Sequence, residues 1–301
     1  MQKTLTQLLD SANHIILGKD LHIRLALCCL LAKGHLLIED IPGVGKTTLS
    51  HTLAKLLGLQ YQRIQFTSDI LPADIVGSSI YDVTKQQFSF HHGPLFKQMI
   101  LADEINRSTP KAQSALLEAM EEQQVTVEGI TYPLPEPFFV IATQNPSHQI
   151  GTFPLPESQL DRFLMRIELG YPNHQAEREL LSGQSRHALI DKLETQLPPA
   201  MLLAMQEAVQ AIHISSALLD YLQALIDYSR QSPEYSCGLS PRAGLALLTA
   251  AKAWAFMQHR DSVLPEDVQA VLPSVAGHRL RAGSVNSAAI VAPLLNDVAI
   301  P

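Results

Sequence analysis

The chain has 301 residues, of which 46% are hydrophobic and 17% are charged, and its formal net charge is −7. This composition is typical of a soluble globular protein that is long enough to bury a substantial core. The negative net charge provides no general attraction to nucleic acids or anionic membranes, so we expect neither as a partner.

The cysteines and the first residues of the chain favour a cytoplasmic location. Cys28, Cys29 and Cys237 show no metal-site spacing, and adjacent cysteines rarely pair, so we interpret all of them as buried thiols in a reducing compartment. Charged and polar residues are scattered through residues 1–20, unlike in a signal peptide. The most apolar early stretch, residues 25–32, is too short to span a bilayer, so we expect no membrane insertion.

Strand-length apolar runs separated by helical patterns occupy the first part of the chain, at residues 35–39, 61–66, 98–102, 138–142 and 164–169. Their continuous rather than alternating apolar character predicts a parallel sheet that is covered on both faces. Two segments near residues 74–93 and 124–134 predict inserted β-hairpins, the second around a Glu128-Gly129 turn.

From about residue 195 onward, only helical spacing remains. Ser240 is the expected N-cap of one of these helices, with Pro241 at its first helical position. We therefore predict an α/β domain over residues 1–194 and a smaller, all-helical domain over residues 195–301.

The segment "HLLIEDIPGVGKTTLS" (residues 35–50) is typical of a phosphate-binding loop between a strand and a helix, although Asp40 replaces the first glycine of the pattern G-x-x-x-x-G-K-[ST]. Gly43 and Gly45 still provide small residues where the backbone must approach phosphate. Lys46 would bridge the β- and γ-phosphates of ATP, and Thr47 would bind Mg²⁺. The alternative is a flexible strand-to-helix turn. The expected nucleotide-binding residues of the loop are Pro42, Gly43, Val44, Gly45, Lys46, Thr47 and Thr48.

A second motif, "QMILADEINRS", places two carboxylates at the end of a buried strand. Asp103 has the position and chemistry of a second Mg²⁺ ligand. Glu104 can act as the general base that polarises the attacking water. The alternative is a solvated Asp-Glu pair, which the phosphate-binding loop upstream disfavours.

These two motifs, followed by "VIATQNP", "FPLPESQLDRF" and "LSPRAGLALLTAAKAWA", resemble the MoxR family of the AAA+ ATPases over nearly the whole chain. The resemblance implies an α/β fold: a parallel five-stranded P-loop core with inserted β-hairpins, followed by a small helical lid domain. An aspartate at the first loop position is common in such proteins, which supports a competent loop.

The resemblance also implies roles for single residues. Asn145 matches sensor 1, which positions water; Arg162 matches the arginine that enters the neighbouring subunit's site; and Arg242 matches sensor 2, which contacts the γ-phosphate. From the residues alone, Asn145 could also be a turn residue and Arg162 a surface ion-pair partner. Gly18 lies in a stretch similar to the one whose backbone contacts adenine. Arg107 is typical of the family, but the sequence does not assign it to its own or a neighbouring site.

The function implied is Mg²⁺-dependent ATP hydrolysis in a ring, expected to be a hexamer, with catalytic residues Glu104, Asn145, Arg162 and Arg242. Relatives are thought to act as chaperone-like factors that mature protein complexes, often metal enzymes, together with a von Willebrand factor A domain protein. One alternative is an MCM-like nucleic-acid motor, although Lys85 is the only lysine or arginine in the predicted hairpins. Another is a nucleotide-gated assembly protein with little turnover. The sequence names no client protein.

Overall fold

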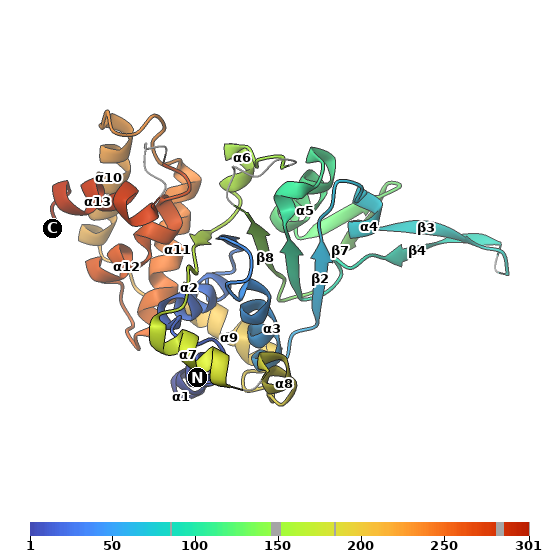
Figure 1. The fold of residues 1–301 in the computed structure, drawn as a ribbon. Helices are drawn as coiled ribbons and strands as arrows, with labels where there is room; N and C mark the ends of the chain where they lie inside the picture. Colours follow the sequence, from blue (N-terminus) through green and yellow to red (C-terminus); the bar gives the residue numbers. More distant parts are fainter. Residues whose placement is uncertain (85, 146–151, 184, 281–285, 301) are drawn as a thin grey trace.

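A parallel sheet with strand order β2-β5-β8-β1-β9 forms the centre of the protein, in a computed structural model that describes residues 1–84, 86–145, 152–183, 185–280 and 286–300 (Figure 1). The strands are β1 (Leu36–Glu39), β2 (Tyr61–Gln65), β5 (Met99–Asp103), β8 (Phe139–Gln144) and β9 (Met165–Ile167). Each strand overlaps one of the predicted apolar runs. The predicted five-stranded parallel core is therefore confirmed.

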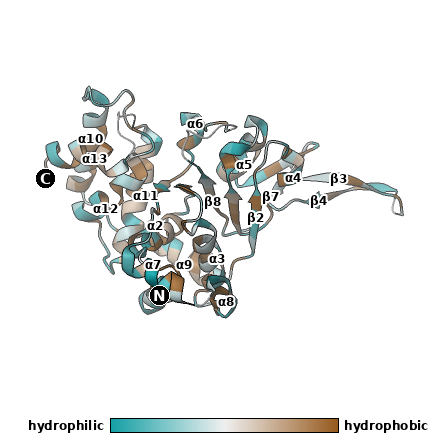
Figure 2. Cartoon of the chain, in the orientation of Figure 1, coloured by the Kyte–Doolittle hydropathy of each residue, from teal (hydrophilic) through white to brown (hydrophobic). Residues whose placement is uncertain are grey.

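The inner strands β1, β5 and β8 are buried on both faces, which explains their continuous apolar runs, whereas the edge strand β2 keeps exposed polar residues. Leu36 and Ile38 of β1 pack into one hydrophobic cluster, whereas Leu37 between them packs into the other. Helices α1 (Gln2–Ile15), α2 (Asp20–Leu31) and α3 (Lys46–Leu56) contribute to the first cluster. Helices α4 (Pro72–Val76) and α5 (Pro110–Glu122) contribute to the second. Figure 2 shows hydrophobic residues running through the central strands.

Two β-hairpins extend from the core, as predicted. Strands β3 (Gly77–Asp82) and β4 (Gln87–His92) form the longer one, which projects far from the body of the protein (Figure 1). Strands β6 (Gln124–Val127) and β7 (Ile130–Pro133) form the shorter one. Its turn residues Glu128 and Gly129 both have left-handed φ angles, of 52° and 80°, as a tight two-residue hairpin turn requires.

The other regular elements of the described chain are helices, apart from an isolated bridge between His213 and Ser262. The confirmed N-cap is Ser240, whose Oγ accepts the Ala243 N–H at 3.0 Å, with Pro241 at the first position of its helix. The division at residues 194 and 195 stays a prediction. Across the described ranges, no helix is both long and apolar enough to cross a membrane. The remaining helices are η1 (Ile105–Arg107), α6 (Glu157–Leu160), α7 (His174–Ser182), α8 (Arg186–Asp191), α9 (Pro199–Gln210), α10 (Ser216–Gln231), α11 (Pro241–Met257), α12 (Pro265–Ala276) and α13 (Ser287–Asp297).

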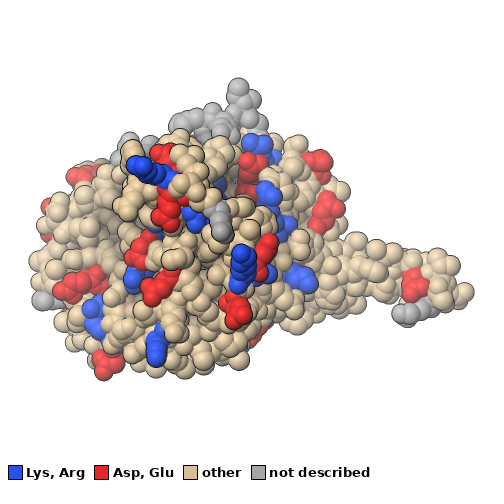
Figure 3. Space-filling model, turned by 60° about the horizontal axis from the view of Figure 1, so that its bottom comes forward, with Lys and Arg blue, Asp and Glu red and all other residues tan. Residues whose placement is uncertain are grey.

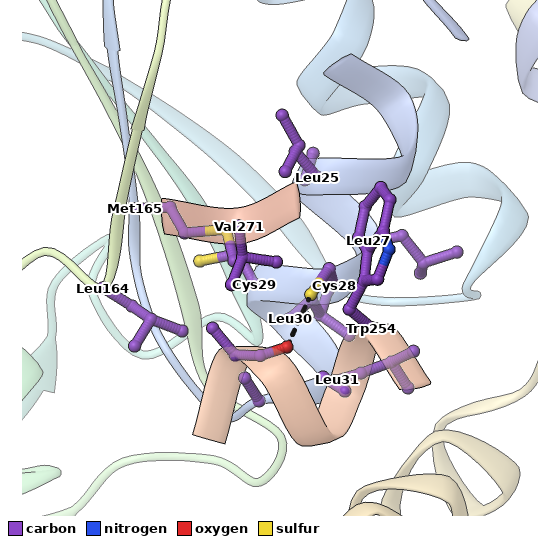
Figure 4. Close-up of a cluster of buried hydrophobic side chains, with 14 of the residues drawn as sticks. Leu25, Leu27, Cys28, Cys29, Leu30, Leu31, Leu164, Met165, Trp254 and Val271 are labelled. Carbon is purple, nitrogen blue, oxygen red and sulfur yellow. Dashed lines mark hydrogen bonds between the residues drawn. The ribbon is translucent and has the colours of Figure 1, made fainter. Parts of the chain in front are cut away.

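Helix α2 connects the sheet to the C-terminal helices (Figure 4). The Cys28 thiol donates to the Ala250 carbonyl of α11 at 3.3 Å, and Cys29 lies beside Met165 of β9 and Val271 of α12. Both thiols are fully buried, as predicted, but Cys237 is exposed, so its interpretation as a buried thiol was wrong. Cys237 lies in the loop between α10 and α11, where no apolar periodicity constrains the residue type.

His35, which precedes β1, makes the stability of the sheet depend on pH. Its Nδ1 accepts the Val140 N–H at 3.0 Å, so its Nε2 donates to the Met120 carbonyl at 3.2 Å, and burial lowers the pKa of this neutral imidazole to about 4. Between pH 6.5 and 4, His35 is therefore protonated in the unfolded chain but stays neutral in the folded state. We expect the contribution of neutral His35 to the free energy of unfolding to be fully present above pH 6.5. It should fall by an amount on the order of 3 kcal/mol as the pH decreases to 4.

Denaturant unfolding of the wild type and His35→Gln at a series of pH values measures this effect. The free energy of unfolding should depend less steeply on pH in the variant, even if the variant is less stable at pH 7. Equal slopes between pH 6.5 and 4 would contradict the assignment to His35.

Candidate functional site

The glycine-rich loop after β1 encloses one side of a cavity of about 310 Å³. Because β1, β5 and β8 are parallel neighbours, the residues at their carboxyl ends meet at this edge of the sheet. The loop contributes the backbone on one side, and β5 and β8 contribute polar side chains on the other. The lining residues are Pro42, Gly43, Gly45, Lys46, Thr47, Thr48, Asp103, Glu104 and Asn145, all of which the sequence had singled out.

The loop has the geometry of an anion cradle. Gly43 and Gly45 have left-handed φ angles of 86° and 97°, which side chains rarely adopt, and a Cβ at either position would meet no atom within 4 Å. The open space thus lies directly against the backbone. No side chain of the described residues caps α3, so its first N–H groups and the positive end of its dipole remain available to an anion. These features fit a phosphate group.

Lys46 is the cation of this cavity. Its ammonium donates to the Asp40 carbonyl at 2.6 Å and to Asn145 Oδ1 at 3.5 Å. Burial lowers the pKa of the Lys46 ammonium, while the carboxylates of Asp40, Asp103 and Glu104 act in the opposite direction. The exposed Thr47 follows Lys46, so a hydroxyl and the Asp103 carboxylate line the same space. Oxygen ligands of this kind suit Mg²⁺ bound together with phosphates.

Asp103 is held rigidly at the end of β5. Thr143 Oγ1 donates to its Oδ1 at 2.6 Å, and Arg63 donates to its Oδ2 from Nε at 3.0 Å and from Nη2 at 2.7 Å. Asp103 is 8% exposed, so these contacts hold its carboxylate in a largely buried position. Asp103 is therefore oriented before any cation binds.

Glu104 is fixed by three side chains. Gln65 donates to its Oε2 at 2.8 Å, Arg107 pairs with the same oxygen at 3.1 Å, and Asn145 donates to its Oε1 at 3.2 Å. Its backbone has a left-handed φ of 57°, an uncommon conformation for a non-glycine residue that is often found at functional sites. The Glu104 N–H donates to Thr143 Oγ1 at 2.9 Å, which helps to hold this conformation.

Four of the predicted site residues lie outside this cavity. Val44 packs against the hydrophobic core, and Gly18 lies against Asn173 and Ala176 at the start of α7. Arg162 and Arg242 line a second cavity of about 330 Å³, where both pair with the carboxylate of Glu121 on α5; the Arg162 Nη2 to Glu121 Oε2 distance is 3.1 Å. The structure thus brings these two arginines together, but not to the loop of their own chain.

The sequence did not single out Arg63, Gln65, Thr143 or Glu121. Arg63 and Gln65 alternate with buried residues on the edge strand β2, a pattern identical to that of ordinary solvent-facing positions. The register pairs Gln65 with Asp103, and this placement depends on the strand order. A usable signal was Thr143, a buried hydroxyl directly after four buried apolar residues of β8.

Comparison with known proteins agrees with this geometry. The profile of the ATPase family associated with various cellular activities (AAA) matches residues 35–165, and an AAA lid domain profile matches residues 227–294. The chain is 38% identical to Chaperone MoxR1 of Mycobacterium tuberculosis over 99% of its own length and 82% of that protein. It belongs to the MoxR family of AAA+ ATPases.

Two further relatives support this placement. YeaC of Bacillus subtilis, a protein without an assigned function, is 43% identical over 97% of this chain and 93% of its own length. The crystal structure of a protein assigned as an ATPase, from Cytophaga hutchinsonii, superposes with a TM-score of 0.89 at 36% identity and covers 100% of this chain and 96% of that one. The α/β core with inserted hairpins and helical lid is therefore the fold of this MoxR-family member.

Proposed function

We propose that this MoxR-family protein hydrolyses ATP with Mg²⁺ at sites that are completed between adjacent copies in a ring. One observation carries the proposal. The cavity at the loop is lined by a lysine, two threonines, an asparagine and two carboxylates but, among the described residues, by no arginine, whereas Arg162 and Arg242 share a different cavity of the same chain. Phosphoryl transfer needs positive charge opposite the developing negative charge, so a second copy is the natural source of these arginines.

Within one subunit, five side chains of the cavity have defined roles. Lys46 and the loop N–H groups bind the phosphates of ATP, and Thr47 and Asp103 bind the metal. When bound, Mg²⁺ neutralises charge on the phosphate oxygens. Glu104 accepts the proton of the attacking water at a carboxylate oxygen, and Asn145, which holds Glu104 Oε1 at 3.2 Å, orients that base and the water.

The arginines act on the neighbouring subunit. In the single chain, the carboxylate of Glu121 pairs with both Arg162 and Arg242, which keeps the two guanidinium groups side by side. We infer that the phosphates of the neighbour's nucleotide compete with Glu121 for these groups in a ring, which we expect to be a hexamer in the cytoplasm. Loss of the γ-phosphate then releases the arginines, and lid and interface rearrange together.

A protein client fits the long hairpin better than a nucleic acid. Ile80, Val83 and Phe88 of the β3–β4 hairpin are 51%, 79% and 69% exposed, and the projecting part in Figure 3 carries few charges. Nucleic-acid binding would instead require cations along such an element; Lys85 lies outside the described residues. We propose a chaperone-like role with a von Willebrand factor A domain partner, on the strength of the family resemblance.

Steady-state ATP hydrolysis across a range of protein concentrations tests the shared site. We expect specific activity to rise with concentration as rings assemble, and to disappear when Mg²⁺ is chelated. Light scattering of the same samples should show the mass increasing over the same range. Constant specific activity in a monomeric sample would contradict the proposal and leave a self-contained nucleotide switch.

A further inference from the structure

The carboxylate of Asp40, at the position where phosphate-binding loops usually have glycine, connects the loop to a distant part of the chain. Asp40 Oδ2 accepts the Gly170 N–H at 2.6 Å, and Oδ1 accepts the Ile41 N–H at 2.8 Å. Asp40 is 8% exposed, so both bonds are largely shielded from water. Each is charge-assisted, which makes it stronger than a neutral hydrogen bond.

The register of the sheet explains this contact. Strands β1 and β9 are parallel neighbours, with Ile38 opposite Ile167, so the residues that follow the two strands also lie side by side. The backbone of Asp40 makes separate contacts, because its N–H donates to the Gln144 carbonyl at 3.1 Å and its carbonyl accepts from Lys46. A glycine at this position could keep both backbone contacts. The bonds to Ile41 and Gly170 require the side chain, and of these only the bond to Gly170 reaches beyond the loop.

Gly170 lies in the middle of a short segment, residues 169–171, which we call the connector because it joins β9 to α7 and the helices beyond. Gly170 has a left-handed φ of 63°, which turns the chain between strand and helix. The Lys19 ammonium donates to the Leu169 carbonyl and, at 2.8 Å, to the Tyr171 carbonyl. Asp40 and Lys19 therefore bind the same three-residue segment, Asp40 at its middle residue and Lys19 at the two residues on either side.

Lys19 reinforces this arrangement and connects it to the expected adenine side of the site. It is 8% exposed; burial lowers the pKa of its ammonium, and the Asp40 carboxylate opposes that shift. Its neighbour Gly18 is packed so closely against α7 that a Cβ there would lie 3.1 Å from that of Ala176. The phosphate-binding loop, the connector and the segment around Gly18 thus form one connected unit.

We propose that Asp40 is a positioning residue that couples the phosphate-binding loop to the connector, so that nucleotide bound at the loop also orders the start of α7. This inference rests on the proposed nucleotide site. It explains why glycine is absent from the first loop position: the side chain provides two acceptors that glycine lacks. Asparagine retains one acceptor oxygen but places an NH₂ group against the second N–H.

The test compares the wild type with Asp40→Gly, Asp40→Asn and the control Asp10→Asn, which removes an exposed carboxylate on α1. Hydrogen–deuterium exchange is followed in peptides covering residues 168–176 and α3, with and without ADP, and ADP affinity is titrated with a fluorescent ADP analogue. Without ADP, we expect exchange in the connector to be about tenfold faster in Asp40→Gly, intermediate in Asp40→Asn and unchanged in Asp10→Asn.

With saturating ADP, the wild type should slow exchange in both regions. Asp40→Gly should slow it in α3 alone, and its ADP affinity should be about tenfold weaker. The proposal is overturned if ADP still protects the connector in Asp40→Gly, or if connector exchange without ADP matches the wild type. Failure of the wild type to bind ADP would instead refute the proposed function, and the ADP-free comparison would still decide whether Asp40 holds the connector.

Discussion

Replacing Glu104 with glutamine is expected to lower ATP turnover by a factor of about 10² to 10⁴, the range typical of losing a general base. ATP binding should change little, because the phosphate contacts come from the loop and Lys46. Glutamine can keep the hydrogen bond from Asn145 Nδ2, which now ends at Glu104 Oε1 at 3.2 Å, so the local geometry should persist. Turnover is measured at saturating ATP, and affinity with the fluorescent analogue.

The matched control is Glu118→Gln, which neutralises an exposed carboxylate on α5. It should hydrolyse ATP at the wild-type rate. If Glu104→Gln also retained wild-type turnover, Glu104 could not be the base, and its uncommon backbone conformation would require another explanation. If it lost nucleotide binding as well, its role would be structural.

The sequence predicted those parts of the fold that depend on local patterns. A strand buried on both faces needs an uninterrupted apolar run, and the inner strands β1, β5 and β8 each contain one. The Glu128-Gly129 turn and the Ser240 cap were predictable for the same reason, since the backbone conformation there restricts the residue types. The cavity at the loop was also accessible, because polar residues that end parallel strands converge at one edge.

Contacts that depend on strand order were not predictable. Arg63 and Gln65 reach Asp103 and Glu104 only because β2 lies beside β5, and Asp40 reaches Gly170 only because β1 lies beside β9. The ion pairs of Glu121 were not predictable either, because Glu121 belongs to a charged helix end that resembles any solvated surface. Its two arginine partners come from α11 and from the turn after α6. Periodicity carries no information about such pairs.

The second large loss of ATP turnover is expected when Arg162 is removed, because this arginine is expected to complete the site of the neighbouring subunit. Arg162→Ala should lower turnover by a factor of about 10³, although each subunit should still bind ATP through its own loop, since Arg162 does not line the loop cavity of its own chain. Arg178→Ala, which removes an exposed arginine from α7, serves as the control and should be fully active. Both are measured at concentrations where the wild type is assembled.

Mixing two inactive variants then separates action within a chain from action between chains. A subunit with Arg162→Ala has an intact Glu104, and a subunit with Glu104→Gln has an intact Arg162. In a ring with head-to-tail contacts, about one site in four of an equal random mixture combines both intact residues, so activity should reappear on mixing. Each site inside a single chain would remain defective in such a mixture. Activity that stays at the level of the separate variants would therefore place Arg162 at the nucleotide of its own chain, and Glu121 would then be its competitor within one subunit.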